Sequence, residues 1–365
     1  MKFKKLLALT LTAFLSAGMM TGCGGKTEAP AENAEKPETE ATETKPEEPA
    51  ETAVKGKVAM ITDVGGVNDQ SFNQSAWQGL QNLGKEGVEV SYIESQKEAD
   101  YAPNLETKIN EGNDLVWGVG FMMKEAMTNK SLDYPDQKFA LIDDSWPDGE
   151  CPNVTGVVFA AEQSSFLVGY IASYMTKTDH VGFVLGMESP TMNKFTNGYY
   201  AGVQYGAAEQ NKKVKIDMVN VESFSDAALG KATAKTMYSD GADIVFHAAG
   251  NVGNGVIEAA KDAGKWVIGV DMDQNHLAPD NVITSAMKNV NIATEDISKR
   301  ILSGEDLGGK TITYPLKEGG VGIAPSSDKL VPAEILEKTK AVEQKIISGE
   351  IVVPETAEEL AKFGK

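Results

Sequence analysis

The segment MITDVGGVNDQSFNQSAWQGL, residues 60–80, interrupts an apolar run with side chains that can hydrogen-bond a small molecule. Asp63 ends the apolar run, and the polar residues that follow surround one aromatic residue; they are Asn68, Asp69, Ser71, Phe72 and Asn73. Carboxylates are strong acceptors for O–H and N–H donors, and an aromatic ring offers a flat apolar face. The segment is therefore either an ordinary strand-to-helix loop with capping residues or one wall of a binding site.

Polar or glycine-bearing segments also end five later apolar runs. They are residues 118–121, Asp143 with Asp144, residues 187–189, residues 247–250, and Asp271 with Asp273. A sheet core does not accept unpaired polar groups, although a single Asp can cap the next helix. Capping suits Asp69 better than Asp63, because Asp63 lies well before the helix start. Parallel sheets bind ligands beyond the carboxyl ends of their strands, so the six segments together predict a cleft.

The elements that would position these residues alternate along the chain. From residue 57 onward, short and nearly continuous apolar runs alternate with amphipathic stretches, which is typical of parallel sheets covered on both faces. Residues 56–365 are too many for one such unit, so we expect an α/β protein with two doubly wound parallel-sheet domains. Segments 153–175 and 281–297 could carry the chain between them. Residues 332–365 are expected to form a helix, a short strand and a final helical turn.

The N-terminus predicts export and lipid anchoring. Residues 1–22 place three lysines before an apolar core that is too short to span a bilayer comfortably. The tetrapeptide MTGC at 20–23 resembles the lipobox, in which the cysteine, here Cys23, is lipidated. We therefore expect a lipoprotein signal peptide at 1–22. Residues 23–55, rich in Glu and Pro, are expected to be a disordered acidic tether that holds the protein on the extracytoplasmic face of the cell membrane.

The net charge and the cysteine and histidine content limit the classes of partner and of bound metal that the protein can have. Removing the three lysines of the signal and the net −5 of residues 26–55 from the formal −19 leaves −17 on residues 56–365. Such an acidic body repels phosphate backbones, so we expect no nucleic-acid partner. Beyond Cys23 only Cys151 remains, which cannot form an internal disulfide. The three histidines stand far apart, and no metal-ligand spacing is present in the sequence.

Several motifs resemble one protein family. The pattern D-x-G-x-x-D-x-S-F-N fits Asp63, Gly65, Asp69, Ser71, Phe72 and Asn73, with one extra residue in the loop. With VGFVLGM, the segment from SFSDAALGKATAKTMYSDG to NGVIEAAKDAG, and VIGVDMDQN, it resembles the basic membrane protein family. These are lipid-anchored substrate-binding proteins of ABC transporters, related to purine nucleoside receptor lipoproteins. The likeness runs over about residues 56–335.

The resemblance implies a two-lobed fold like that of type I periplasmic binding proteins, with a hinge of several crossing segments. Lobe 1 would comprise residues 56–165 and about 289–320, and lobe 2 residues 166–288 and about 321–365. It further implies a binding protein and not an enzyme, with no cofactor. The partners would be a nucleoside ligand, ABC permease subunits and the membrane.

Carried over by position, the resemblance implies roles for individual residues. Phe72 would be one face of the sandwich around the base, with Asp63 and Asn73 hydrogen-bonding the base edge or fixing the loop that does. Asp143, Asp271 and Lys288 would hold the ribose. The second aromatic face is left open between Phe246, His247 and Phe224. His247 is favoured because it is the last side chain before a glycine-bearing turn. The further candidates for ligand contact are Ser71, Gly120, Met187, Phe224 and Gly250.

The physics agrees with this assignment. Flat bases favour aromatic stacking, neutral hydroxyls donate well to carboxylates, and a phosphate would be repelled by Asp63, Asp143 and Asp271. A sugar-binding protein of the same fold and a ligand-sensing receptor lipoprotein remain alternatives. A nucleoside hydrolase fits less well, because no acidic metal cluster and no nucleophile motif are apparent. No G-x-G-x-x-G follows the first strand, which argues against dinucleotide binding.

Overall fold

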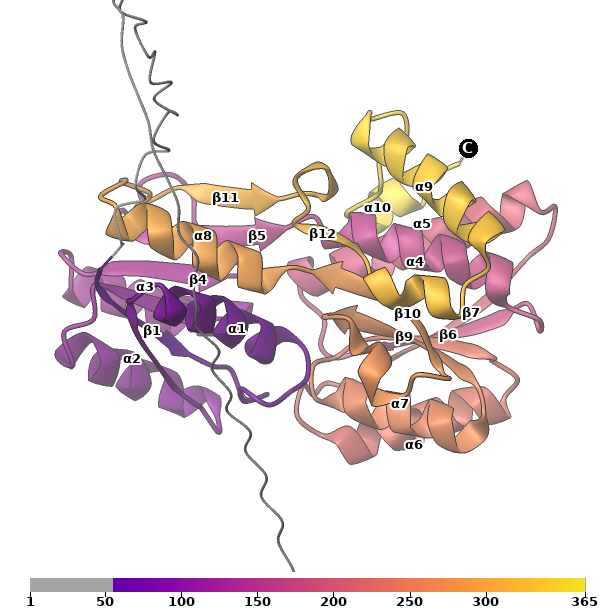
Figure 1. The fold of residues 1–365 in the computed structure, drawn as a ribbon, viewed down its shortest axis with the longest axis horizontal. Coiled ribbons are helices and arrows are strands. Elements are labelled where there is room, and N and C mark those ends of the chain that lie inside the picture. The colour runs from indigo at the N-terminus through magenta and orange to yellow at the C-terminus, as the bar shows by residue number, and fades with distance from the viewer. Residues whose placement is uncertain (1–54, 365) are drawn as a thin grey trace, which may run out of the picture. The chain divides into compact units, whose positions relative to one another are not determined.

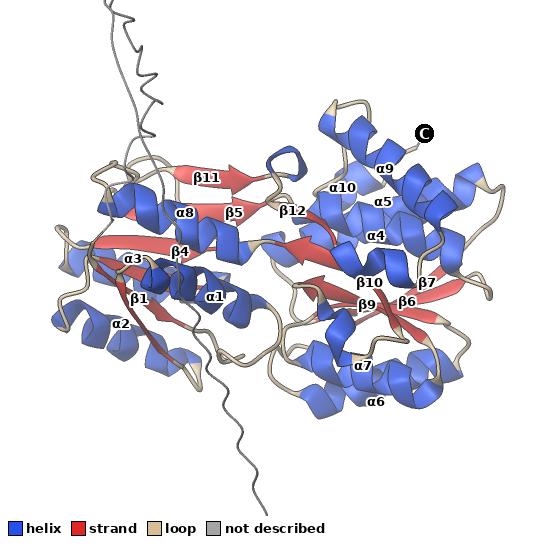
Figure 2. Cartoon of the chain, viewed as in Figure 1, coloured by secondary structure: helices blue, strands red, loops and turns tan. Residues whose placement is uncertain are grey.

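The computed structural model describes residues 55–364. The predicted signal peptide, Cys23 and nearly all of the predicted tether lie outside these residues. Strands alternate with helices along the described chain (Figure 2), and the strands form two six-stranded sheets. The predicted α/β architecture with two mainly parallel sheets is therefore confirmed.

The first sheet has the strand order β11-β5-β4-β3-β1-β2, and every neighbouring pair is parallel. Its strands are β1 (Lys57–Ile61), β2 (Glu89–Ile93), β3 (Leu115–Val119), β4 (Lys138–Ile142), β5 (Val154–Phe159) and β11 (Thr311–Tyr314). All five residues of β3 are buried, because helices cover both faces of the sheet. Helices α1 (Phe72–Lys85) and α8 (Val290–Leu302) pack on one face, and α2 (Tyr101–Asn110) and α3 (Lys124–Asp133) on the other (Figure 1). We call this part lobe 1.

The second sheet has the order β12-β10-β9-β8-β6-β7 and is parallel except for the β10–β12 pair. Its strands are β6 (His180–Leu185), β7 (Lys215–Asn220), β8 (Ile244–Ala248), β9 (Trp266–Asp271), β10 (Val282–Lys288) and β12 (Val321–Ile323). Helices α4 (Ala161–Met175), α5 (Pro190–Glu209) and α9 (Ala333–Ile347) pack on one side, and α6 (Ala227–Ser239) and α7 (Val252–Ala263) on the other (Figure 1). We call this part, with the short α10 (Ala357–Leu360), lobe 2.

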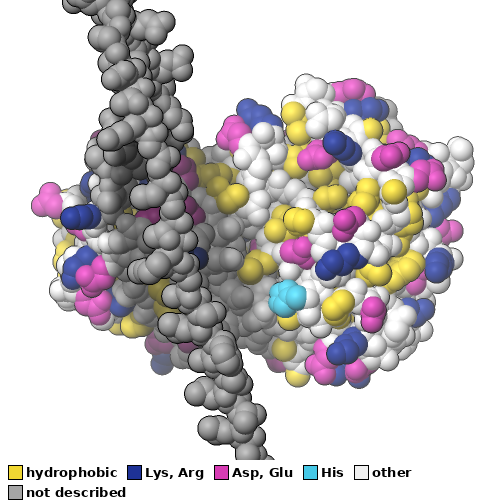
Figure 3. All heavy atoms as spheres, in the orientation of Figure 1, with side chains coloured by type: hydrophobic (Ala, Val, Ile, Leu, Met, Phe, Trp, Pro, Cys, Tyr) yellow, Lys and Arg dark blue, Asp and Glu magenta, His cyan; other side chains and the backbone are white. Residues whose placement is uncertain are grey.

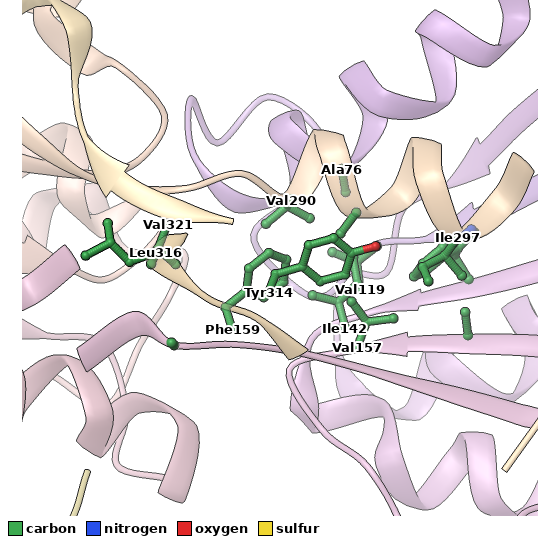
Figure 4. Close-up of a cluster of buried hydrophobic side chains, with 14 of the residues drawn as sticks. Ala76, Val119, Ile142, Val157, Phe159, Val290, Ile297, Tyr314, Leu316 and Val321 are labelled. Carbon is green, nitrogen blue, oxygen red and sulfur yellow. The ribbon is translucent and has the colours of Figure 1, made fainter. Parts of the chain in front are cut away.

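The chain passes between the lobes three times. It leaves lobe 1 after β5 to enter α4, returns from β10 into α8, and leaves again from β11 toward β12. The core of lobe 1 reaches these crossings, because Phe159, Tyr314 and Val321 belong to one buried cluster with Val119 and Ile142 of the sheet (Figure 4). Phe159 and Tyr314 stack with ring centroids 5.5 Å apart. A packed hinge of this kind supports the strand ends that face the other lobe.

The C-terminal tail differs from the sequence-based prediction. The expected short strand after α9 is wrong: residues 350–354 pair with no sheet. The apolar residues that suggested a strand, Ile351 and Val353, are instead buried in a hydrophobic cluster that also contains Val342 and Ile346 of α9. The alternate residues of this segment are therefore buried because an irregular segment packs on the protein, and not because a strand joins the hydrogen-bond ladder of a sheet.

On the part of the described surface that Figure 3 shows, side chains of both signs are interspersed with apolar ones. Some large hydrophobic residues are exposed, such as Leu132 and Val352, which is normal for a folded protein. Within residues 55–364, no helix combines the length and the apolar character needed to cross a membrane.

Candidate functional site

A cavity lies where strand ends of the two lobes face each other. It encloses about 520 Å³ of space not occupied by protein atoms, part of it open to solvent. Its lining residues are Asp63, Gly65, Asp69, Phe72, Asn73, Gly120, Phe121, Met122, Asp143, Met192, Phe195, Phe224, Ala248, Ala249, Gly250, Val270, Asp271 and Lys288. They lie at or beyond the ends of β1, β3, β4, β6, β7, β8, β9 and β10, so the cavity lies at the carboxyl ends of both sheets.

Most residues singled out in the sequence converge here. Six of the seven predicted ligand-binding residues line the cavity: Asp63, Phe72, Asn73, Asp143, Asp271 and Lys288. Three of the further candidates, Gly120, Phe224 and Gly250, also line it. Their convergence from distant points of the chain is what a binding site requires, and their contacts with a ligand stay a prediction.

The prediction that His247 faces the cleft is wrong. Its side chain is fully buried, and its ring packs so closely on α7 that a Cβ at Gly253 would lie 2.1 Å from His247 Cε1. Phe246 points to the opposite face, where it stacks on Phe183 with centroids 4.8 Å apart. Side chains near a strand end still point toward the covered faces of the sheet, so the cavity meets Ala248 and Ala249 instead.

Two further candidates lie beside the cavity and not in its lining. Met187 lines an adjoining groove together with Met122 and Phe224. Asp63, Asp143 and Asp271 form what we call the acidic wall of the cavity. The hydroxyl of Ser71 donates a hydrogen bond of 2.5 Å to Asp271 Oδ2 of this wall. The structure therefore assigns Ser71 to positioning a carboxylate.

The loop after β1 is organised around Asp69 and Asn73. Asp69 Oδ1 accepts from the backbone N–H groups of Ser71 and Gln74, at 2.9 and 3.1 Å, and Oδ2 accepts from Asn73 N at 2.9 Å. These bonds satisfy free N–H groups at the start of α1, in agreement with the capping role predicted for Asp69. Asn73 Nδ2 donates to Asp63 Oδ1 at 2.8 Å and to Asp69 Oδ2 at 3.0 Å. The same network places Phe72, the first residue of α1, at the cavity.

Asp143 and Asp271 occupy matching positions in the two lobes, just beyond or at the ends of β4 and β9. Both have left-handed backbone conformations, with φ of +74° and +62°. Such a conformation is uncommon for residues other than glycine, is least unfavourable for Asp and Asn, and often marks a functional site. In each case the turn directs the carboxylate into the cavity. If the strand continued, the same carboxylate would be buried in the sheet.

Lys288 joins the two lobes electrostatically. It ends β10 of lobe 2, is 2% exposed, and donates to Asp143 Oδ2 of lobe 1. Its Nζ also lies 4.4 Å from the centroid of the Phe72 ring and 5.9 Å from that of Phe195, which are cation–π distances. A single buried cation therefore lies among the carboxylates and the aromatic faces.

Burial leaves the acidic wall only partly stabilised in its charged form. Desolvation raises the pKa of Asp63 to about 6, although hydrogen bonds from Gly65 and Asn73 oppose the shift. Desolvation also raises the pKa of Asp271 to about 6, against the attraction of Lys288 and the hydrogen bond from Ser71. Asp143 Oδ1 and Asn73 Oδ1 are buried without a hydrogen-bond partner. The cavity is thus rich in acceptors and fits a ligand that supplies donors.

Four phenylalanines line the cavity, and two of them, Phe121 and Phe195, were not among the residues predicted to contact the ligand, although the segment 118–121 was predicted to lie at the cleft. Phe121 directly follows Gly120 and meets Phe224 of the other lobe edge-on, with centroids 6.2 Å apart. Phe195 lies in the second turn of α5, whose start is fixed by Ser189 accepting from Met192 N at 3.1 Å. The signal available in the sequence was that α5 begins directly after the end of β6, so its first turns face the cleft.

Phe224 is the second aromatic face that the structure offers in place of His247. It comes from the loop between β7 and α6 and lies against Gly186, where a Cβ would approach the ring to 2.3 Å. The absence of a side chain at position 186 therefore makes room for the ring beside the cavity. Among the described residues, no group of three or more acidic, histidine or cysteine residues could hold a metal ion.

Two mainly parallel sheets with a cavity at the carboxyl ends of both are the architecture of two-lobed solute-binding proteins. Residues 56–357 match the family model described as ABC transporter substrate-binding protein PnrA-like. The chain belongs to this family, whose members bind substrates for transport rather than act as enzymes. The resemblance found in the sequence is thereby confirmed.

Individual proteins agree with the family assignment. The chain is 38% identical over 313 residues to basic membrane protein A1 of Borrelia garinii, covering 85% of this chain and 91% of that protein. It is 37% identical over 320 residues to the ABC transporter nucleoside-binding protein BmpA of Lactococcus lactis, covering 82% and 89%. A solved ABC transporter solute-binding protein from Aeropyrum pernix superposes with a TM-score of 0.76 at 29% identity, covering 84% of this chain and 95% of that one.

Proposed function

We propose that this protein is an extracytoplasmic lipoprotein that captures a nucleoside, of the purine class, between its lobes and delivers it to an ABC permease. The observation that carries the proposal is the composition of the cavity. Carboxylates from both lobes and one lysine lie beside aromatic faces, and a nucleoside offers hydroxyl donors beside a flat base. The nucleoside-binding name of the Lactococcus lactis relative supports the same ligand class. Anchoring through Cys23 rests on the sequence alone.

Within this proposal each group of the ligand has a partner. The ribose hydroxyls donate to Asp143 and Asp271, and Lys288 donates to a ribose oxygen. The base lies between Phe72 and Phe224, with Asn73 Oδ1 accepting from an N–H of its edge. A 5′-phosphate would bring two negative charges next to the acidic wall, so the site favours nucleosides over nucleotides.

Competition calorimetry with guanosine, adenosine, uridine, ribose and guanosine 5′-monophosphate tests this function. We expect one nucleoside per chain, displacement of one purine nucleoside by another, and no heat from the monophosphate. Binding of ribose with the same affinity as guanosine would instead assign the chain to the sugar-binding alternative. Release of free base during the titration would reveal a hydrolase.

Nucleoside affinity should fall when the pH is lowered from 7 to 5. The pKa values of Asp63 and Asp271 are raised to about 6, so both groups gain protons in this range, and a protonated carboxyl is a poorer acceptor for a hydroxyl. We expect about a tenfold loss for each pH unit below 6 from Asp271, which accepts from a ribose hydroxyl in this proposal. Calorimetry at pH 6 in two buffers of different ionisation enthalpy should show protons released on binding. Identical heats in the two buffers and a flat pH profile would contradict the prediction.

The same pKa values determine how the stability of the ligand-free protein changes with pH. Because the folded-state pKa of each carboxyl lies above its unfolded value of 3.8, protonation stabilises the folded state. The contribution is fully present below about pH 4 and is lost as the pH rises through about 6. Ligand binding and stability of the empty cavity therefore respond to pH in opposite directions.

Replacing Asp271 by Asn should weaken binding of guanosine about tenfold. The amide keeps the shape of the side chain but loses the charge that strengthens a hydrogen bond from a ribose hydroxyl, a difference of about 1 to 1.5 kcal/mol. Titrations with guanosine and 2′-deoxyguanosine should show a smaller preference for the ribonucleoside in the variant than in the wild type. An unchanged preference would place Asp271 away from the 2′-hydroxyl.

A further inference from the structure

Three consecutive residues of lobe 1 make direct hydrogen bonds to lobe 2. The carbonyl of Asp69 accepts from Asn254 Nδ2 at 3.1 Å, and the carbonyl of Gln70 accepts from Gln274 Nε2 at 2.9 Å. The hydroxyl of Ser71 donates to Asp271 Oδ2. The partners come from α7, from the end of β9 and from the 3₁₀ turn η3 (Gln274–Leu277). One short turn therefore contacts three separate elements across the cleft.

The turn is shaped for these contacts. Gln70 has a φ of +59°, a left-handed conformation that a residue with a side chain adopts at a cost and that persists only when its surroundings stabilise it. Within the residues that the structure describes, the hydrogen bond of the Gln70 carbonyl runs to lobe 2 and not to its own lobe. The contact across the cleft thus compensates for the local strain.

The lobe 2 partners are held ready by their own lobe. Gln274 is fully buried, its Oε1 accepts from Val270 N at 2.9 Å, and its backbone N–H donates to Ser285 Oγ at 3.2 Å. These bonds fix the side-chain amide so that Nε2 points to Gln70. Asn254 Nδ2 is likewise shared with Asn251 Oδ1 at 2.8 Å. Ordering these side chains therefore costs little when the turn arrives.

Neither Asn254 nor Gln274 lines the cavity. We propose that these two side chains, with the Asp69–Ser71 turn that they hold, form a latch that stabilises the closed arrangement of the lobes through protein–protein hydrogen bonds. The latch sets nucleoside affinity from residues that do not touch the ligand, an inference that rests on the proposed function. A ligand that binds the closed arrangement gains apparent affinity in proportion to the population of that arrangement.

Asn254→Ala and Gln274→Glu test the latch in the full chain. The glutamate keeps the acceptor for Val270 N and the side-chain volume but replaces the donor to Gln70 with an oxygen. Asn254→Ala should weaken guanosine binding about three- to tenfold, the loss expected for one net hydrogen bond. Gln274→Glu should weaken it by at least as much, because its carboxylate oxygen would also face the Gln70 carbonyl at a buried position. The loss should lie in a faster dissociation rate, because opening precedes release. The control is Asn281→Ala, which removes hydrogen bonds to Lys265 O and Ala260 O inside lobe 2 and should leave the affinity unchanged.

Small-angle scattering of the ligand-free chain separates the latch from the ligand assignment. Both latch variants should have a larger radius of gyration than the wild type and the Asn281→Ala control, whether or not any nucleoside binds. If the latch variants are larger in this way and the wild type does not bind guanosine, the latch is upheld and the proposed function is overturned. Latch variants that match the wild type in scattering and in guanosine dissociation rate, or an affinity loss shared by the control, would overturn the latch.

Discussion

Replacing Lys288 by Met should lower the free energy of unfolding by about 3 to 5 kcal/mol and abolish nucleoside binding. Lys288 is 2% exposed and pairs with Asp143, which is 4% exposed. Removing one member of a buried ion pair leaves the other charge uncompensated, which is a large cost. The same substitution removes the attraction that lowers the pKa of Asp271. Chemical denaturation at pH 7, with and without guanosine, measures both effects.

The double variant Lys288→Met, Asp143→Asn is the matched control for this prediction. It replaces the pair by two neutral side chains, so most of the stability should return. Binding should stay lost, because neither the cation nor the carboxylate is available to the ribose. If the free energy of unfolding of the single variant Lys288→Met lay within about 1 kcal/mol of that of the wild type, the charge of Asp143 would not depend on Lys288 for its stabilisation.

Phe72→Ala should weaken guanosine binding by about 1 to 3 kcal/mol, the contribution of one aromatic face to base stacking. The ring is only partly buried and packs at the edge of the lobe 1 core, so the thermal stability of the empty protein should change much less than the affinity. Calorimetric titration and thermal denaturation of the same samples give the two quantities.

Phe72→Leu separates stacking from packing. Leucine keeps much of the apolar contact with the core but has no flat face, so it should restore stability without restoring affinity. If Phe72→Ala lost stability and kept the affinity of the wild type, the ring would belong to the core and not to the site.

The fold and the acidic wall could be predicted because they follow from periodicity. Apolar runs that alternate with amphipathic stretches indicate parallel sheets, and the carboxyl ends of parallel strands meet at one edge. Asp63, Asp143 and Asp271 stand at such ends and do converge. Lys288 was identified only through the family resemblance, because a lysine at a strand end has an ordinary structural explanation. Phe72 was an open candidate from the sequence alone, and the resemblance decided between ligand contact and packing at the helix start.

The remaining parts depend on tertiary contacts that a linear pattern does not encode. His247 was favoured by its place before a turn, and Phe246 was an open alternative, yet both point into covered faces of the sheet. Phe224 reaches the cavity because a loop folds back over Gly186, and Phe195 does so because of where α5 starts. The latch partners Asn254 and Gln274 meet a turn about 200 positions away in the chain, a contact that local patterns do not reveal.

A retention experiment tests the central claim most directly. The refolded full chain would be mixed with equal amounts of nucleosides, free bases, ribose and nucleoside monophosphates, freed of unbound small molecules by gel filtration, and then denatured for mass spectrometry. The proposed site predicts that one purine nucleoside per chain is released and that the Phe72→Ala variant releases less. Release of ribose in its place, or of none of these compounds from a chain that is folded, would contradict nucleoside capture.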